Sequence, residues 1–211
     1  MVKKIVFIIM AVSISIFAAA LSKTEIANAY KDSYALEAQG RYTEAIRAIN
    51  PIVLKYENGY TINFRMGWLS YLAGNYANSE KYYKKSLAVY PASLEVMSAM
   101  CKLLAAKKLW TRVEEQSRRM LNVDYYNLEG NGWYAYALRM QKKNDQAIKV
   151  NQKMLLVYPT SIQFLNSLGL CYFDVGDFKS ASSTFQSVLT LDPYNQTAKL
   201  YVGIIFKNGK K

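Results

Sequence analysis

Residues 162–195 read IQFLNSLGLCYFDVGDFKSASSTFQSVLTLDPYN, and the same arrangement recurs upstream at intervals of 34 residues. Counting back from Gly176 in steps of 34 residues gives Lys142, Lys108, Gly74 and Gly40. The same steps give Ala147, Val113, Ser79 and Ala45 from Ala181. From Pro193 they give Pro159, Tyr125, Pro91 and Glu57. Five units therefore follow one another without an insertion or deletion, over residues 26–59, 60–93, 94–127, 128–161 and 162–195. A shortened sixth unit begins at Gln196.

Each unit has the pattern of two helices joined by a short turn. In the second unit, the small Gly67 lets a partner helix approach, and Gly74 ends the first helix in the left-handed conformation that glycine adopts at little cost. Tyr83 and Leu87 stand at i and i+4 on one face of the second helix, and Pro91 cannot continue that helix. We therefore predict an all-α protein built from repeated helix pairs.

The key residues of the fifth unit resemble those of the tetratricopeptide repeat, with leucine in place of the usual tryptophan. They are Leu165, Leu168, Gly169, Tyr172, Ala181, Phe185 and Pro193. The resemblance implies a right-handed α-solenoid of five helix-turn-helix units, closed by a C-terminal capping helix over residues 196–207. It also implies a scaffold or adaptor that binds a protein or peptide segment.

The first 29 residues have the layout of a secretory signal peptide. Lys3 and Lys4 precede an apolar run, and small residues follow at 18–20 and 27–29. We predict cleavage after Ala29, which leaves residues 30–211 as the solenoid. Cleavage after Ala20 and an uncleaved membrane anchor are the alternatives. The expected location is the periplasm or the outside of the cell, within an envelope assembly.

The composition argues against catalysis and against metal binding. The chain has no histidine, which is the commonest general base and metal ligand. Cys101 and Cys171 are too few for a zinc site and too far apart along the solenoid to form a disulfide. We expect no enzymatic activity, no cofactor, no metal and no small-molecule substrate. Export and the separation of basic from aromatic residues argue against nucleic acid as a partner.

By resemblance, the first helix of each unit lines the concave face of the solenoid, where a partner segment binds. The residues that we assign to this surface are Tyr34, Phe64, Trp68, Tyr71, Lys102, Tyr136, Arg139 and Met140. Most are aromatic. Among them, Trp68 and Tyr136 stand at a place that points outward from the helix pair.

A second surface follows from the net charge of +12, which comes from 27 Lys and Arg against 15 Asp and Glu. Basic side chains recur on the outer face of the second helices, at i, i+3 and i+4 spacing. Lys81, Lys84, Lys85, Arg118, Arg119, Lys149 and Lys153 form this convex basic stripe. It is either a solvated face or, as an alternative function, the contact with an anionic membrane or cell-wall polymer.

Overall fold

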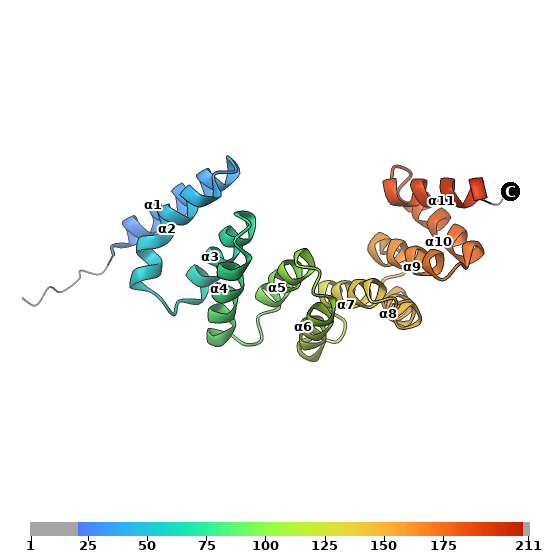
Figure 1. Cartoon of the computed structure of the whole chain (residues 1–211), viewed down its shortest axis with the longest axis horizontal. Helices are drawn as coiled ribbons and strands as arrows, with labels where there is room; N and C mark the ends of the chain where they lie inside the picture. The colour runs from blue at the N-terminus through green and yellow to red at the C-terminus, as the bar shows by residue number, and fades with distance from the viewer. Residues whose placement is uncertain (1–20, 209–211) are drawn as a thin grey trace, which may run out of the picture.

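The computed structural model describes residues 21–208, which form eleven α-helices and no β-strand. The helices follow one another along a curved row from α1 at one end to α11 at the other (Figure 1). The first helices of the units are α1 (Lys23–Ala38), α3 (Tyr60–Leu72), α5 (Leu94–Ala106), α7 (Leu128–Met140) and α9 (Ile162–Asp174). The second helices are α2 (Tyr42–Lys55), α4 (Tyr76–Val89), α6 (Trp110–Val123), α8 (Asn144–Val157) and α10 (Phe178–Leu191), and α11 (Gln196–Asn208) ends the row.

This architecture confirms the predicted right-handed α-solenoid of five units with a capping helix. The first helices of units two to five begin at residues 60, 94, 128 and 162, which are the first residues of the predicted units. The capping helix α11 begins at Gln196, as expected. The period of the sequence and the period of the structure are therefore the same.

The turn inside every unit contains one residue with a positive φ angle. Gly40, Gly74 and Gly176 supply it in units one, two and five, with φ values of 72°, 74° and 82°. Lys108 and Lys142 take the same conformation in units three and four, with φ values of 55° and 60°. A side chain is disfavoured there because its Cβ approaches the following carbonyl oxygen. The common turn geometry is thus kept even where glycine is missing.

The core of each unit lies between its two helices. Tyr83 and Phe185 are fully buried. A Cβ atom on Gly169 would lie only 2.7 Å from a ring carbon of Phe185, and one on Gly67 would overlap the Tyr83 ring. Gly67 therefore provides the close helix approach that the sequence predicts, and Gly169 provides the same approach in unit five.

The two cysteines are free and buried, as expected. Burial raises the pKa of the Cys101 thiol to about 12 and that of the Cys171 thiol to about 11, which makes both poor nucleophiles at neutral pH. Among the described residues, no group of His, Cys, Asp and Glu side chains is arranged to hold a metal ion.

The first unit includes residues that lie before the predicted cleavage position at Ala29. Ser22 caps α1: its hydroxyl accepts a hydrogen bond from the Glu25 backbone N–H at 3.1 Å, and the Glu25 carboxylate accepts one from the Ser22 N–H at 2.7 Å. Leu21, Ile26 and Ala29 pack against the core that α1 and α2 share with α3.

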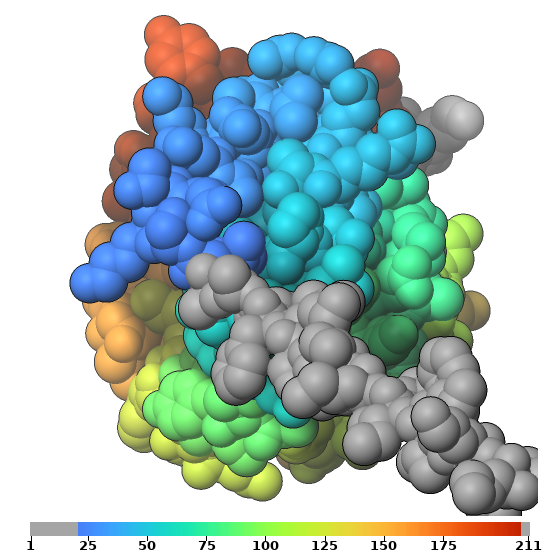
Figure 2. Space-filling model, turned by 90° about the vertical axis from the view of Figure 1, so that its left-hand side faces the viewer, coloured from blue at the N-terminus to red at the C-terminus, as the bar shows by residue number. Residues whose placement is uncertain are grey.

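Viewed from the α1 end, the atoms of this first unit lie in front of those of the later units (Figure 2). The basic and apolar parts of the predicted signal peptide, residues 1–20, lie outside the described residues. No described helix has the length and apolar character of a membrane span.

Candidate interaction groove

The first helices of units one and two line a pocket on the side that the resemblance assigns as the concave face. This N-terminal pocket, with a volume of about 670 Å³, lies between α1 and α3. Its aromatic lining comes from Tyr30, Tyr34, Tyr42, Phe64 and Trp68. Three of the predicted groove residues, Tyr34, Phe64 and Trp68, are therefore brought together here. Tyr34 is the most open of them, with 57% of its surface exposed.

Arg65 forms the floor of the N-terminal pocket, although it is only 5% exposed. Its guanidinium lies 3.8 Å from the centre of the Tyr34 ring, makes an ion pair with Glu37, and donates to the Ser33 hydroxyl at 2.9 Å. The charge of Arg65 is thus matched by a carboxylate from the neighbouring unit. A buried charge without such a partner would be strongly destabilising.

Trp68 lies where the N-terminal pocket meets the middle of the groove. Its indole N–H donates to a Glu37 carboxylate oxygen at 2.6 Å. Its ring stacks on Tyr71 with 5.8 Å between centroids, and the Lys102 ammonium lies 5.2 Å from the ring centre. Glu37 therefore holds both Arg65 and Trp68, and the indole is fixed in place before any partner arrives.

A second pocket, of about 690 Å³, continues the groove across units two to five. We call it the central pocket. Tyr71, Lys102 and Tyr136 line it, as predicted, together with Trp133 and Gln163. The Trp133 indole N–H donates to the Ser98 hydroxyl at 3.1 Å, and its ring meets Tyr136 edge-on at 6.2 Å. Trp68 lines the N-terminal pocket and Tyr71 lines the central pocket, so the stack of these two rings lies between the pockets.

The two remaining predicted groove residues lie outside both pockets. Arg139 makes an ion pair with Asp174 at 3.0 Å, so its charge is already matched within the chain. Met140 lines a shallow hollow at the turn edge with Trp110 and Arg112. Both residues stand in the last turn of α7.

Sequence reasoning missed Arg65 and Trp133, each the sixth residue of its unit. The sequence did contain a signal for them, because a large side chain, Arg65 or Trp133, stands at the sixth position of two units. The prediction of the groove did not include the sixth position.

On the convex side, several members of the basic stripe are already paired. Lys84 pairs with Glu80 at 2.9 Å, Lys85 with Glu57 at 2.6 Å, and Arg118 with Glu114 at 3.1 Å. Arg119 donates to the Gln116 side chain, and Lys81 lies 5.8 Å from the centre of the Tyr82 ring. Lys149 and Lys153 join Arg118 in lining a third pocket, between α6 and α8.

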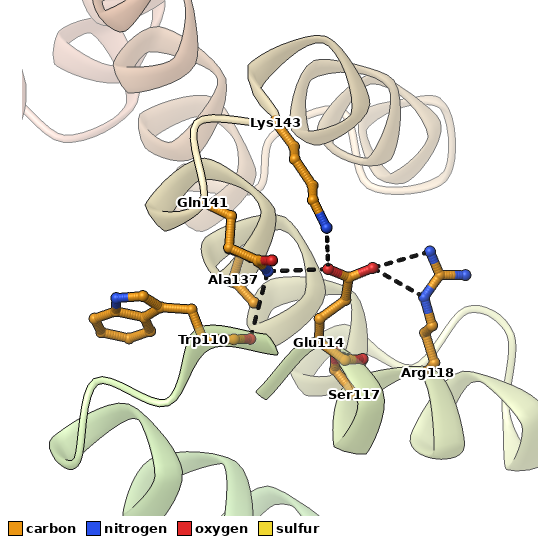
Figure 3. Close-up of polar contacts among 7 residues, drawn as sticks. All are labelled: Trp110, Glu114, Ser117, Arg118, Ala137, Gln141 and Lys143. Atoms are coloured by element: carbon orange, nitrogen blue, oxygen red, sulfur yellow. Dashed lines mark hydrogen bonds and ion pairs between the residues drawn. The ribbon is translucent and has the colours of Figure 1, made fainter. Parts of the chain in front are cut away.

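Glu114 is the centre of the polar contacts that connect units three and four (Figure 3). Its carboxylate accepts hydrogen bonds from Lys143 at 2.8 Å, Gln141 at 2.9 Å and Arg118 at 3.1 Å. Burial alone would raise the pKa of Glu114, but the bonds from these three donors outweigh it and hold the pKa below its usual value. Glu114 therefore neutralises part of the stripe while joining two units.

Comparison with known proteins agrees with this architecture. Residues 30–93 and 162–195 match sequence models of the tetratricopeptide repeat. The chain therefore contains tetratricopeptide repeats over these residues, in agreement with its helix pairs.

Several solved structures are similar over most of the chain, and two of them serve as examples. One is MamA, residue 41 to the end, from Desulfovibrio magneticus RS-1, at 17% identity and a TM-score of 0.72, over 84% of this chain and 99% of that one. The other is a tetratricopeptide repeat protein from Parabacteroides merdae ATCC 43184, at 16% identity and a TM-score of 0.74, over 88% of this chain and 72% of that one. At sequence identities this low, the similarity shows only that these proteins share a fold with this chain.

One curated relative, Superkiller protein 3 of Schizosaccharomyces pombe, is 26% identical over 135 residues, or 61% of this chain. The match covers 10% of that relative, so the chain corresponds to a small part of it.

Proposed function

We propose that this chain is an exported adaptor that holds a segment of a partner protein in its concave aromatic groove, as part of an envelope assembly. Tetratricopeptide repeats form interaction scaffolds, and the solenoid presents an extended concave surface that suits this role. The proposal rests above all on Trp68. Its indole is held by Glu37, stacked on Tyr71 and flanked by Lys102, at the junction of two pockets.

Preorganised aromatic side chains in a concave site are the usual anchors of protein interfaces. Because the rings of Trp68, Tyr71 and Trp133 are already ordered by contacts within the chain, binding costs less conformational entropy than ordering them anew. The aromatic side chains of both pockets favour apolar or aromatic side chains of the partner. In the central pocket the exposed Lys102 and Glu129 suit polar groups of the partner between them. A helix or an extended segment satisfies these requirements equally.

The test uses two exposed tyrosines, each with a cation over its ring. Tyr34 lies in the groove below which Arg65 is buried, whereas Tyr194 lies outside it, with Lys199 at 5.1 Å from its ring centre. A photoreactive residue is placed at either position in cells, and proteins crosslinked from position 34 but not from 194 are identified and purified. Tyr34→Ala should then weaken the purified partner's binding about tenfold or more, and Tyr194→Ala should not. Equal affinities of both variants and the wild type would refute the groove as the binding site.

Export is part of the same proposal. The packing of the first unit helps to choose between the two predicted cleavage positions of the signal peptide. Cleavage after Ala29 would remove Leu21, Ile26 and Ala29 from the packed core together with the cap formed by Ser22. Cleavage after Ala20 leaves all of them in place. We therefore favour a mature chain that begins Leu21-Ser22. Mass spectrometry of the N-terminal peptide of the exported protein decides between Leu21, Tyr30 and an intact N-terminus.

The alternative function, attachment to an anionic membrane or cell-wall surface through the convex basic stripe, has less support. Three of the seven stripe residues are matched by carboxylates of the same chain. Surface charges that are already paired and exposed to salt contribute little to further attraction. Binding that persists at high salt would favour the groove, and binding that is lost steeply would favour the stripe.

A further inference from the structure

The third pocket differs from the two concave ones in both position and charge. It has a volume of about 680 Å³ and lies between α6 and α8, with α7 beneath. Arg118, Lys149 and Lys153 line it with two aromatic side chains, Tyr125 and Tyr134. None of the described residues that line it is acidic. We call it the convex cationic pocket.

Two of the three basic groups of this pocket, Lys149 and Lys153, have no carboxylate partner among the described residues. The Lys153 ammonium donates to the Asn131 side-chain oxygen at 2.6 Å and lies 3.9 Å from the centre of the Tyr125 ring. Burial lowers the pKa of Lys153. Lys149 is exposed, and within the described part of the chain it takes part in no hydrogen bond or ion pair. Only Arg118 has a carboxylate partner, Glu114, and its guanidinium also lies 4.7 Å from the centre of the Tyr134 ring.

This combination occurs at one unit boundary of the solenoid. Because the units are in register, the equivalents of Arg118, Lys149 and Lys153 can be read at the other boundaries. They are Asn50, Lys81 and Lys85 between units one and two, Lys84, Glu115 and Arg119 between units two and three, and Gln152, Ser183 and Ser187 between units four and five. The three cations at one boundary are therefore a local feature rather than a consequence of the repeat.

We propose that the convex cationic pocket binds a phosphate group carried by a ring-shaped or planar organic moiety. A phosphomonoester carries close to two negative charges at neutral pH and offers three acceptor oxygens. It therefore matches a pocket lined by three cationic side chains better than a single carboxylate would. Arg118 and Lys149 reach the phosphate as charge-assisted donors. The rings of Tyr125 and Tyr134 provide flat apolar faces for the attached moiety. This site is separate from the concave groove and does not depend on the function proposed for it.

The first experiment measures binding by calorimetry with phenyl phosphate, inorganic phosphate and phenol. Phenyl phosphate should bind saturably, more tightly than inorganic phosphate, and phenol should not bind. Affinity should fall as salt is added, because the contacts are ionic. Tyr125→Ala should weaken phenyl phosphate more than inorganic phosphate, because the exposed ring faces the attached moiety while it also contacts Lys153. Absence of saturable binding of phenyl phosphate would overturn the proposal.

A matched pair of variants separates the pocket from general surface charge. Lys149 and Lys81 are both exposed and occupy the same place in units four and two. Lys149→Gln should weaken phenyl phosphate about tenfold, the loss expected for one charge-assisted hydrogen bond, and Lys81→Gln should not weaken it. Equal effects of the two variants would mean diffuse attraction and would refute a defined site.

The source of the phosphate is identified with phosphatidylcholine vesicles that contain or lack phosphatidic acid. Binding to the acidic vesicles that Lys149→Gln removes and Lys81→Gln keeps would indicate a lipid headgroup. Binding of phenyl phosphate without binding to the acidic vesicles would indicate a soluble phosphate ester. Both results support the pocket, whereas vesicle binding that both variants retain would exclude a lipid at this site.

Discussion

At the scale of single residues, three glycines occupy the same place in their units but have different surroundings. Gly67 and Gly169 face the rings of Tyr83 and Phe185, whereas a Cβ atom on Gly203 of α11 would meet no atom within 4 Å apart from its chain neighbours and the backbone of its own helix. We expect Gly169→Ala to cost about 1–3 kcal/mol of unfolding free energy, because the added methyl group displaces a buried ring. Gly203→Ala should instead stabilise by up to about 1 kcal/mol, because alanine favours helix.

Chemical denaturation of the two variants checks this pair. Gly67→Ala is the second test of the tight contact and should resemble Gly169→Ala. Similar changes at Gly203 and Gly169 would show that glycine flexibility, rather than ring packing, governs these positions.

Replacing the two lysines of the left-handed turns with glycine should make the protein more stable. Lys108 and Lys142 are exposed and hold φ values that glycine adopts with less strain. Lys108→Gly and Lys142→Gly should each stabilise the protein by roughly 0.5–1 kcal/mol, the strain removed less the extra freedom of glycine in the unfolded chain. Lys108→Ala removes the same charge but keeps a Cβ atom, so it should give no such gain. Thermal melting of the three variants measures the difference.

At the scale of elements, α1 is the first helix of the part of the chain that the structure describes. A protein that begins at Leu21 should be as stable as one with the preceding residues. One that begins at Tyr30 loses the cap of α1 and the packing of Leu21 and Ile26, on the order of 2–3 kcal/mol.

Because each solenoid unit contacts only its neighbours, this loss should be local. Hydrogen exchange should therefore become faster in α2, which covers α1, and remain unchanged in α8 and α9. Unchanged exchange in α2 of the shorter protein would show that residues 21–29 contribute nothing to the first unit.

At the scale of the whole molecule, ion pairs connect every unit to the next. Glu37–Arg65, Glu80–Arg112, Glu114–Lys143 and Arg139–Asp174 cross the four successive boundaries. Hydrogen bonds from Arg112 and Lys84 lower the pKa of Glu80 from 4.5 to about 2. Since the folded pKa is below the unfolded one, this stabilisation is complete above about pH 4.5 and is lost as the pH falls toward 2.

Denaturation at a series of pH values tests this coupling. Glu80→Gln should be less stable than the wild type at neutral pH and should lose less stability between pH 4.5 and 2, because its side chain cannot be protonated. Glu115→Gln serves as the control, since Glu115 is exposed and makes no ion pair among the described residues, and its curve should parallel the wild type. Parallel curves for Glu80→Gln and the wild type would contradict the assigned pKa.

The helix pairs, their register and the close contacts within each unit follow from the sequence alone. These features depend on residues a few positions apart and on a period that repeats without interruption. The close helix approach at Gly67 and the buried face that carries Tyr83 could therefore be predicted from the pattern of the second unit. The aromatic character of the groove followed in the same way, because one face of every first helix points to the same side.

Which groove residues act together, and which charges are free, depends on the packing of one unit against the next. Glu37 holds Arg65 and Trp68, Ser98 holds Trp133, and Asp174 pairs with Arg139, all across unit boundaries. The three cations of the convex pocket likewise come from two units. The pattern within one unit specifies which side of a helix a residue occupies. The position of the polar end of a long side chain depends on the twist between units. It also depends on the hydrogen-bond and ion-pair partners that this twist brings near.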